Sequence, residues 1–354
     1  MPDFPRKANF ASDNVSGASP EIVAALIAAA EGGAMPYGAD DWTARLEAKC
    51  AEIFETDVAV FPVVTGTAAN ALALAALTPP HGAIYCHPGS HAYADECGAP
   101  EFYSGGAKMV TVDGDNGKIA AGDLAAMLAD ARPHGVHNVR PAALTISQAS
   151  EAGTVYSPDG LAALAEVAHG HGMGVHMDGA RFANALVYQG LSPADATWRC
   201  GVDVLSFGAT KNGALAAEAV IFFRPELAGE FGERRKRGGH LLSKQRFISA
   251  QLEAYLSGGL WLANARAANR AAARLAEGLA ALDGARLVHP VEANEVFTAL
   301  PEPVVEALEG NGFGFYRMGG GPDDGSDGGV VIRLVASFNT TDADVDAFLA
   351  AASA

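Results

Sequence analysis

Short apolar runs recur along the first two thirds of the chain. Each is followed by a turn of small or polar residues and then by helical spacing. "DVAVFPVV" at 57–64 leads into "TGTAANALALAAL" at 65–77, and "MGVHM" at 173–177 leads into "DGARFANAL" at 178–186. Strand-length runs that alternate with helices predict a mainly parallel sheet with helices on both faces. Ligands of such sheets bind beyond the carboxyl ends of the strands, so a site is expected in the turns that follow the runs.

The last third of the chain has a different pattern. Helical spacing runs from about residue 245, and short strand-like runs then surround one further helical segment. The strand-like runs are "ARLVHP", "EVFTALP", "GFGFYRMG" and "GVVIRLVAS", and the helical segment is "PEPVVEALEGNG". We expect an N-terminal segment and large α/β domain in residues 1–250, and a long helix with a small α+β domain in residues 251–354. The glycine- and aspartate-rich stretch 319–329 predicts a flexible hairpin loop.

Charge and length narrow the class of protein. The 354 residues carry a formal net charge of -17 at pH 7, and 49% of them are hydrophobic. This acidic balance argues against nucleic acid and anionic membrane surfaces as partners, since both carry negative charge. The apolar stretches near the N-terminus span only about ten residues, too few to cross a bilayer. Because the four cysteines form no CxxC pair and no signal-peptide pattern is present, we expect a cytoplasmic protein.

The turn at Thr65-Gly66-Thr67 opens a helix directly after a predicted strand. The free backbone N–H groups and the positive dipole end at such a helix start attract anions, and a glycine lets the backbone approach a ligand. Gly66 and Thr67 are therefore candidates for binding a phosphate group. A helix that is simply capped by threonine is the alternative interpretation of the same residues.

Three further predicted strand ends are followed by His91, Asp178 and Lys211. Taken alone, His91 is typical of a surface turn, and Lys211 of a surface side chain that extends into solvent. Together with an anion-binding turn, a carboxylate and a lysine at successive strand ends indicate a pyridoxal 5'-phosphate (PLP) site. Asp178 would keep the pyridine nitrogen protonated, Lys211 would form a Schiff base with the aldehyde, and His91 would stack on the ring.

A metal centre is the competing interpretation of this region, because His169, His171 and His176 lie close to Asp178 in the sequence. The first two fall in a predicted helix-to-strand turn, and the third alternates along a strand. Neither placement has the spacing of a metal site, so we predict none.

Seven motifs stand in order along the chain. They are "SDN" at 12–14, "YGADDWTARLE" at 37–47, "TGTAAN" at 65–70, "SHAYADECGAP" at 90–100, "DGARFANA" at 178–185, "TKN" at 210–212 and "VIRLVAS" at 331–337. This set resembles the low-specificity threonine aldolases, a group of β-eliminating lyases among the fold-type-I PLP enzymes. The resemblance covers nearly the whole chain and implies their α/β, transferase-like fold.

The resemblance also implies a reaction: PLP-dependent cleavage of L-threonine, L-allo-threonine or relatives such as phenylserine into glycine and an aldehyde. The implied catalytic residues are Lys211, His91 and Glu96. The implied cofactor ligands are Gly66, Thr67, His91, Asp178, Arg181, Lys211 and, toward a neighbouring subunit, Lys244. The implied substrate ligands are Ser12, Tyr37, Arg181 and Arg333, with the arginines pairing with the α-carboxylate. A homo-oligomer is implied as well, with a dimer of dimers as the expected assembly.

One segment departs from the family pattern. Where relatives have Glu-Asn-Thr-His-Asn-Gly, this chain has "SQASEAG" at 147–153. Ser150 or Glu151 therefore stands near the position of the histidine that approaches the substrate β-hydroxyl group in relatives. The base that takes the hydroxyl proton is left open among His91, Glu96, Glu151 and a bound water.

Two other functions stay open at this point. One is a PLP lyase that eliminates a β-substituent from a different amino acid. The other is a catalytically inactive binding protein on the same fold. The joint presence of Asp178, Lys211 and Arg333 argues against the second, because binding alone does not require this combination.

Overall fold

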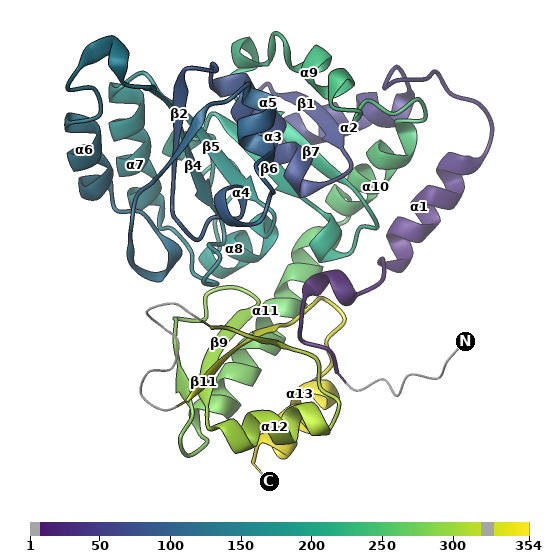
Figure 1. Ribbon diagram of the computed structural model, residues 1–354. Coiled ribbons are helices and arrows are strands. Elements are labelled where there is room, and N and C mark those ends of the chain that lie inside the picture. The colour runs from purple at the N-terminus through teal and green to yellow at the C-terminus, as the bar shows by residue number, and fades with distance from the viewer. Residues whose placement is uncertain (1–7, 320–328, 354) are drawn as a thin grey trace.

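The computed structural model describes residues 8–319 and 329–353, which form a large and a small domain connected by the long helix α11 (Leu260–Ala280) (Figure 1). Most of the predicted hairpin loop at 319–329 lies outside these residues. No helix among those described is both long and apolar enough to cross a membrane.

The large domain is built on a seven-stranded sheet with the order β1-β7-β6-β5-β4-β2-β3. The strands are β1 (Ala59–Val63), β2 (Gly82–Cys86), β3 (Lys108–Thr111), β4 (Arg140–Ser147), β5 (Gly174–Gly179), β6 (Val204–Gly208) and β7 (Glu218–Phe222). Only β7 runs antiparallel to its neighbours in this sheet, so the predicted mainly parallel sheet is confirmed. The amino end of β7 consequently lies at the same edge as the carboxyl ends of the other strands.

Helices cover both faces of this sheet (Figure 1). They are α1 (Pro20–Ala30), α2 (Asp41–Phe54), α3 (Gly66–Leu77), α4 (His91–Ala94), α5 (Ala99–Ser104), α6 (Ala121–Ala129), α7 (Pro158–Gly170), α8 (Phe182–Gln189), α9 (Phe231–Arg237) and α10 (Arg246–Leu256). Val204 of β6 packs with Leu72 of α3 on one face, whereas Leu205 packs with Phe182 of α8 on the other. This alternation follows from the two-residue period of a strand.

Helix α3 is buried on all sides, because α5 and α9 pack against it away from the sheet. Its residues from Ala68 to Ala75 are all buried, and all but Asn70 are alanine or leucine. A helix that is apolar around its whole circumference is typical of such a central position. Asn70 is therefore conspicuous as the single polar side chain in that stretch.

The small domain contains a four-stranded antiparallel sheet with the order β10-β11-β9-β8. Its elements are β8 (Arg286–Leu287), β9 (Glu295–Leu300), α12 (Glu302–Gly310), β10 (Tyr316–Arg317), β11 (Val330–Val335) and α13 (Asp342–Ala352). Each of the four strand-like runs of the sequence contains one of these strands. The domain limits 1–250 and 251–354 stay a prediction.

The N-terminal segment belongs structurally to the small domain. The backbone N–H of Phe10 donates to Gly314 at 2.7 Å, and Phe10 accepts from the N–H of Val335 at 2.7 Å. The Phe10 ring is buried against Phe348 of α13, with ring centroids 5.2 Å apart. These contacts fix the segment that leads to Ser12, which carries the first predicted motif.

Candidate active site

The residues predicted to hold a cofactor lie at the carboxyl edge of the large sheet. Asp178 is 5% exposed near the end of β5. Lys211 is half-buried in a short 3-10 turn, Thr210–Asn212, that follows β6. Gly66 and Thr67 form the first turn of α3 directly after β1. Three separate strand ends thus supply these residues from one edge of one sheet.

Asn70 connects two of the predicted side chains. Its Nδ2 donates to Asp178 Oδ2 and to Glu96 Oε1, both at 2.8 Å. Glu96 Oε1 also lies 2.9 Å from His91 Nδ1, and the backbone N–H of Ala180 donates to Asp178 Oδ1 at 3.0 Å. The hydrogen bond with Glu96 raises the pKa of His91, and burial raises the pKa of Glu96. Because both its oxygens accept hydrogen bonds, the Asp178 carboxylate has a fixed orientation.

A buried histidine, His176, lies near Asp178 on β5. His176 stands two residues before Asp178 on the same face of β5. Its Nδ1 lies 2.8 Å from Thr145 Oγ1, and its Nε2 lies 2.8 Å from Ser206 Oγ. Burial lowers the pKa of His176 to about 4, so the ring is neutral at pH 7. Among the described residues, no group of three or more His, Cys, Asp or Glu side chains is arranged to hold a metal ion.

The turn that carries Lys211 is fixed by its neighbours. Asn212 Nδ2 donates to Tyr255 Oη at 2.6 Å and to the Trp261 carbonyl at 2.9 Å. Gly213 follows with φ at 110°, a conformation that favours glycine. The Lys211 amine makes no hydrogen bond or ion pair with any described residue. The turn is therefore fixed by its neighbours, while the Lys211 amine that it carries is not engaged by any described residue.

Glu218, at the amino end of β7, lies beside this turn. It is buried, and its Oε2 accepts from the backbone N–H of Ala209 at 3.0 Å. Burial raises its pKa to about 7, against the opposing effects of Thr210 and Lys211. The antiparallel direction of β7 brings this carboxyl group to the edge that also carries Lys211.

Arg181 is held by two carboxylates. Its Nε and Nη2 donate to Asp13 at 2.8 and 3.2 Å, and its Nη1 lies 3.3 Å from Glu295 Oε2. All three side chains are buried. Burial opposes the charged form, but Asp13 and Glu295 raise the pKa of Arg181 overall. The hydrogen-bonding groups expected to face a substrate carboxylate are thus engaged by the protein itself.

Arg333 has more of its guanidinium available. The side chain is half-buried in β11, and its Nη2 donates to the Ala11 carbonyl at 3.3 Å. Its Nε is buried without a partner, and the guanidinium lies 5.3 Å from the centre of the Tyr316 ring. Ser12 directly follows Ala11 in the sequence, and its Oγ accepts a hydrogen bond from the Asn14 N–H at 3.1 Å.

Tyr37 and Lys244 lie together at the protein surface. The Tyr37 N–H donates to the Ser243 carbonyl at 3.0 Å, next to Lys244, and both side chains are exposed. Lys236 lies 4.6 Å from the centre of the Tyr37 ring. In the described part of the chain, no hydrogen bond, ion pair or ring contact joins these residues to Asp178 or Lys211. They remain predictions for a site shared between subunits.

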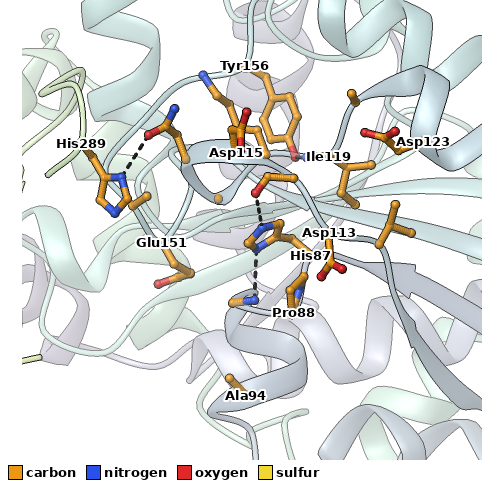
Figure 2. A pocket seen from close by; sticks show the side chains of 18 of the residues that line it. His87, Pro88, Ala94, Asp113, Asp115, Ile119, Asp123, Glu151, Tyr156 and His289 are labelled. Carbon is orange, nitrogen blue, oxygen red and sulfur yellow. Dashed lines mark hydrogen bonds between the residues drawn. The ribbon is translucent and has the colours of Figure 1, made fainter. Parts of the chain in front are cut away.

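A large cavity of about 1440 Å³ adjoins this edge of the sheet (Figure 2). Glu151 and Arg333 line it, together with the segment 112–120 and side chains of the small domain. Lys211 and Asp178 are not in its lining, so this cavity is an approach to the predicted cofactor position and does not enclose it.

Sequence reasoning assigned no role to several residues of this region. They are Asp13, Asn70, Glu218 and Glu295. Asp13 and Asn70 stood inside quoted motifs, but their partners are far away in sequence. Glu218 and Glu295 interrupt apolar strands, and a charged residue in such a run is the signal that could have identified them.

Comparisons with known proteins identify the family of this chain. The sequence profile described as "Beta-eliminating lyase" matches residues 9–302. The chain belongs to the β-eliminating lyase family. A low specificity L-threonine aldolase of a Pseudomonas species is 42% identical to this lyase over 336 residues, which are 95% of this chain and 94% of the relative. Another, from Pseudomonas aeruginosa, is 45% identical over 312 residues, 87% and 89% of the two chains.

Solved structures agree with the fold of this lyase. The threonine aldolase of Leishmania major superimposes with a TM-score of 0.89 at 28% identity, covering 98% of both chains. An aspartate aminotransferase of Rhodobacter sphaeroides, at 19% identity and a TM-score of 0.71, shares the fold. The predicted family, fold class and PLP dependence are therefore confirmed.

The side chains of this lyase fit its cofactor. The uncommitted amine of Lys211 suits a covalent bond to an aldehyde. The buried, oriented carboxylate of Asp178 suits a protonated ring nitrogen, and the first turn of α3 offers N–H groups for a phosphate. Each of the three chemical groups of PLP thus has a matching partner at one edge of the sheet.

Proposed function

We propose that this lyase cleaves L-threonine, L-allo-threonine and related β-hydroxy-α-amino acids into glycine and an aldehyde. Both curated relatives are named low specificity L-threonine aldolases and match nearly their full length. The observation that carries the proposal is that Asp178 and Lys211 stand at one edge of the large sheet, while Arg333 of the small domain lines the adjoining cavity, which is large enough for an amino acid.

Each residue has a proposed part. Lys211 would hold the cofactor through its amine, and Asp178 would keep the ring nitrogen protonated. The bound cofactor supplies an acceptor for the electron pair of the breaking Cα–Cβ bond. Gly66 and Thr67 bind its phosphate, and His91, oriented by the network through Glu96, stacks on its ring.

The substrate carboxylate needs a cation at a fixed place. Arg333 provides it, because its Nη1 makes no hydrogen bond with any described residue and the side chain lines the cavity. Arg181 adds positive charge, while its pairs with Asp13 and Glu295 hold it in position. Ser12 can donate its hydroxyl proton to the same carboxylate.

We further propose that the protein works in the cytoplasm as a homo-oligomer, a dimer of dimers. Tyr37 and Lys244 would then reach the site of a neighbouring subunit, since both are exposed on one surface. The acidic net charge supports a small amino acid as partner rather than nucleic acid.

A panel of substrates tests the reaction. Purified enzyme with PLP is incubated with the threonine, allo-threonine and phenylserine isomers, and glycine and aldehyde are quantified. The L-isomers should give both products in equal amounts. Ammonia and a 2-oxo acid from other β-substituted amino acids, without glycine, would instead identify an eliminating lyase. If none of these amino acids gave a product, a catalytically inactive binding protein would be the remaining interpretation.

A further inference from the structure

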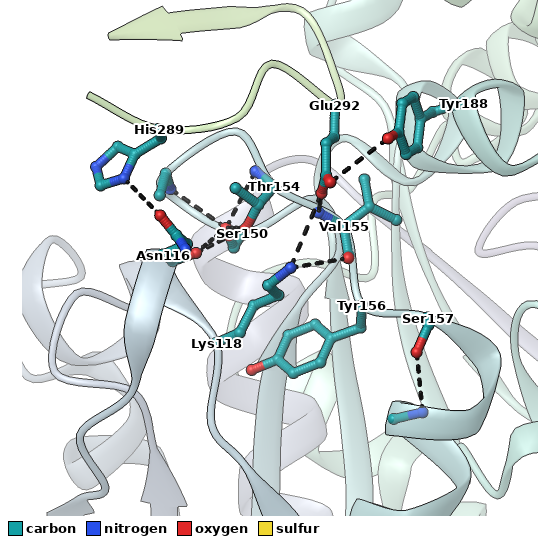
Figure 3. A network of polar contacts seen from close by, with 12 residues as sticks. Asn116, Lys118, Ser150, Thr154, Val155, Tyr156, Ser157, Tyr188, His289 and Glu292 are labelled. Carbon is teal, nitrogen blue, oxygen red and sulfur yellow. Dashed lines mark hydrogen bonds and ion pairs between the residues drawn. The ribbon is translucent and has the colours of Figure 1, made fainter. Parts of the chain in front are cut away.

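The loop after β4 replaces the family's histidine segment, and the structure fixes its conformation (Figure 3). Gln148 bridges the loop, since its Nε2 donates to the Tyr156 carbonyl at 3.1 Å and its Oε1 accepts from the Tyr156 N–H at 3.0 Å. Thr154 Oγ1 donates to the Asn116 carbonyl at 2.6 Å and lies 2.8 Å from Ser150 Oγ. Both ends of the loop are thereby tied to the large domain.

The other side of the loop is held by Glu292 of the small domain and by Lys118 of the large domain. The Val155 N–H donates to Glu292 Oε2 at 2.7 Å, and Lys118 Nζ donates to the Val155 carbonyl at 3.2 Å. Gly153 has φ at 72°, and a Cβ there would lie 3.0 Å from the Glu295 carbonyl oxygen. A loop held this closely has few ways to reorient, so the directions of its side chains are set.

The sequence left open whether Ser150 or Glu151 takes the position of the family histidine. Of these two residues, Ser150 faces the protein interior. It is completely buried, and its Oγ donates to the Asn116 carbonyl at 3.1 Å. A hydroxyl group committed in this way cannot reach a substrate. Ser150 is therefore part of the support for the loop.

Glu151 faces the cavity instead (Figure 2). Its carboxylate makes no hydrogen bond or ion pair with any described residue, in contrast to the side chains on either side of it in the loop. Both Glu151 and Arg333, the proposed carboxylate ligand, line this cavity. An unpaired carboxylate beside the substrate position is available to exchange a proton.

The charged groups around Glu151 come from the cofactor edge. Those that influence its pKa are Arg181, Asp178, Lys211 and His91, and it in turn influences Glu295. Burial raises the pKa of Glu151, with Arg181 and Lys211 opposing that shift. A carboxyl group whose pKa lies closer to neutral is a better general base at physiological pH than an ordinary one.

Two of the other candidate bases are already engaged by hydrogen bonds within the protein. Glu96 is buried, shares one oxygen with Asn70 and His91, and does not line the cavity. His91 does not line it either, and its Nδ1 is engaged by Glu96. Glu151 combines access to the cavity with a carboxylate that no described residue engages, and the charge of Lys211 acts on its pKa.

We propose that Glu151 is the general base that takes the proton of the substrate β-hydroxyl group during cleavage. The O–H bonding pair becomes the second bond of the aldehyde carbonyl, and the proton moves to the Glu151 carboxylate. The Cα–Cβ bonding pair stays with Cα, stabilised there by the bound cofactor, until a proton from solvent is added to give glycine. Glu151 returns its own proton to solvent after the aldehyde leaves. This inference rests on the proposed aldolase function.

The test compares Glu151→Gln with Asp115→Asn in the PLP-loaded enzyme. Asp115 is an exposed carboxylate in the same cavity, so its variant controls for the loss of one negative charge. Glu151→Gln should lower kcat for L-threonine cleavage by roughly 10²–10³-fold with little change in KM, since a positioned base contributes about that much. Asp115→Asn should stay within about twofold of wild type.

A second reaction separates a role in chemistry from a role in structure. Wild type and variants are given glycine in deuterium oxide, and exchange of its α-proton is followed by NMR. Glycine has no β-hydroxyl group, so Glu151→Gln should exchange at the wild-type rate and keep the wild-type cofactor absorbance. Equal losses in exchange and cleavage, or unchanged cleavage, would overturn the assignment.

Glu151→His provides a third arm, because it restores the residue type of the relatives. It should recover cleavage relative to Glu151→Gln, and the acidic limb of its kcat/KM profile should move to higher pH, since histidine has the higher ordinary pKa. An acidic limb that is identical in all variants would contradict the role of Glu151. Wild type that releases no glycine from any β-hydroxy amino acid would instead refute the proposed function.

Discussion

Charged side chains are paired at the carboxyl edge of the large sheet, called here the inner edge. They are unpaired on the exposed acidic side of the cavity, called here the outer wall. At the inner edge, His91, Glu96 and Asp178 are joined through Asn70, and Arg181 is paired with carboxylates. On the outer wall the acidic side chains are exposed and have no ion pair with a described residue. They are Asp95, Asp113, Asp115 and Asp123.

The difference is one of preorganisation. Buried charges need partners, and the partners fix each group in the geometry that catalysis requires. Exposed carboxylates are stabilised by water and need none. Lys211 at the inner edge and Glu151 in the cavity lining are both left without partners among the described residues, and these are the groups to which we assign reactions. The following changes test this contrast.

The largest effect is expected for Lys211→Ala. Without the amine, the cofactor has no covalent attachment, and turnover should fall by roughly four orders of magnitude or more. The visible absorbance band of the cofactor, which borohydride removes in wild type, should be absent. Lys108→Ala, at an exposed position of β3, is the control. Retention of both the band and activity in the Lys211 variant would end the PLP assignment to this residue.

Asp13→Ala should have the largest effect on stability. Arg181 would lose two hydrogen bonds while staying buried, at a cost of about 3–5 kcal/mol in the free energy of unfolding. Chemical denaturation at pH 7 measures it, with Asp123→Ala as the exposed control. A loss below about 1 kcal/mol would mean that Glu295 alone is enough to hold Arg181.

His176 predicts a dependence of stability on pH. Its pKa is about 4 in the folded protein, against 6.5 ordinarily, so the unfolded chain binds more protons between these values. Stability should therefore be present above pH 6.5 and fall as the pH drops toward 4, by up to roughly 3 kcal/mol from this group. His176→Gln should show a shallower fall over the same range in denaturation curves. Parallel curves would show that the ring is not kept neutral by burial.

The smallest effect is expected on the outer wall. Asp123→Asn removes a charge that is exposed and unpaired, so stability should change by less than about 0.5 kcal/mol. The kcat/KM for L-threonine should stay within about twofold. A much larger loss would show that the outer wall contributes to substrate binding, and the contrast between the two regions would need revision.

Much of the fold and part of the site could be predicted from local patterns. Alternating strand and helix periods indicated the mainly parallel sheet, because each period depends on residues close together in the chain. Asp178, Lys211 and Gly66 were identifiable for the same reason: each follows its own apolar run. A parallel sheet then brings successive strand ends to one edge without further information.

The partners of these residues could not be found in the same way. Asp13 lies 168 residues from Arg181, and Asn70 lies 108 residues from Asp178. No local pattern encodes such pairs, because they depend on how the domains and helices pack. The position of Glu218 likewise depended on the direction of β7, which the sequence pattern left undetermined.

Ser150 and Glu151 show most directly which features follow from the sequence and which follow from the tertiary structure. By itself, the sequence established a resemblance, which implied that the histidine of the family pattern is absent and that Ser150 or Glu151 stands near its position. Only the tertiary structure decided between them: contacts with Asn116 turn Ser150 inward, while Glu151 faces the cavity. The physical reason is that side-chain direction in an irregular loop follows from long-range contacts rather than from a repeating backbone geometry.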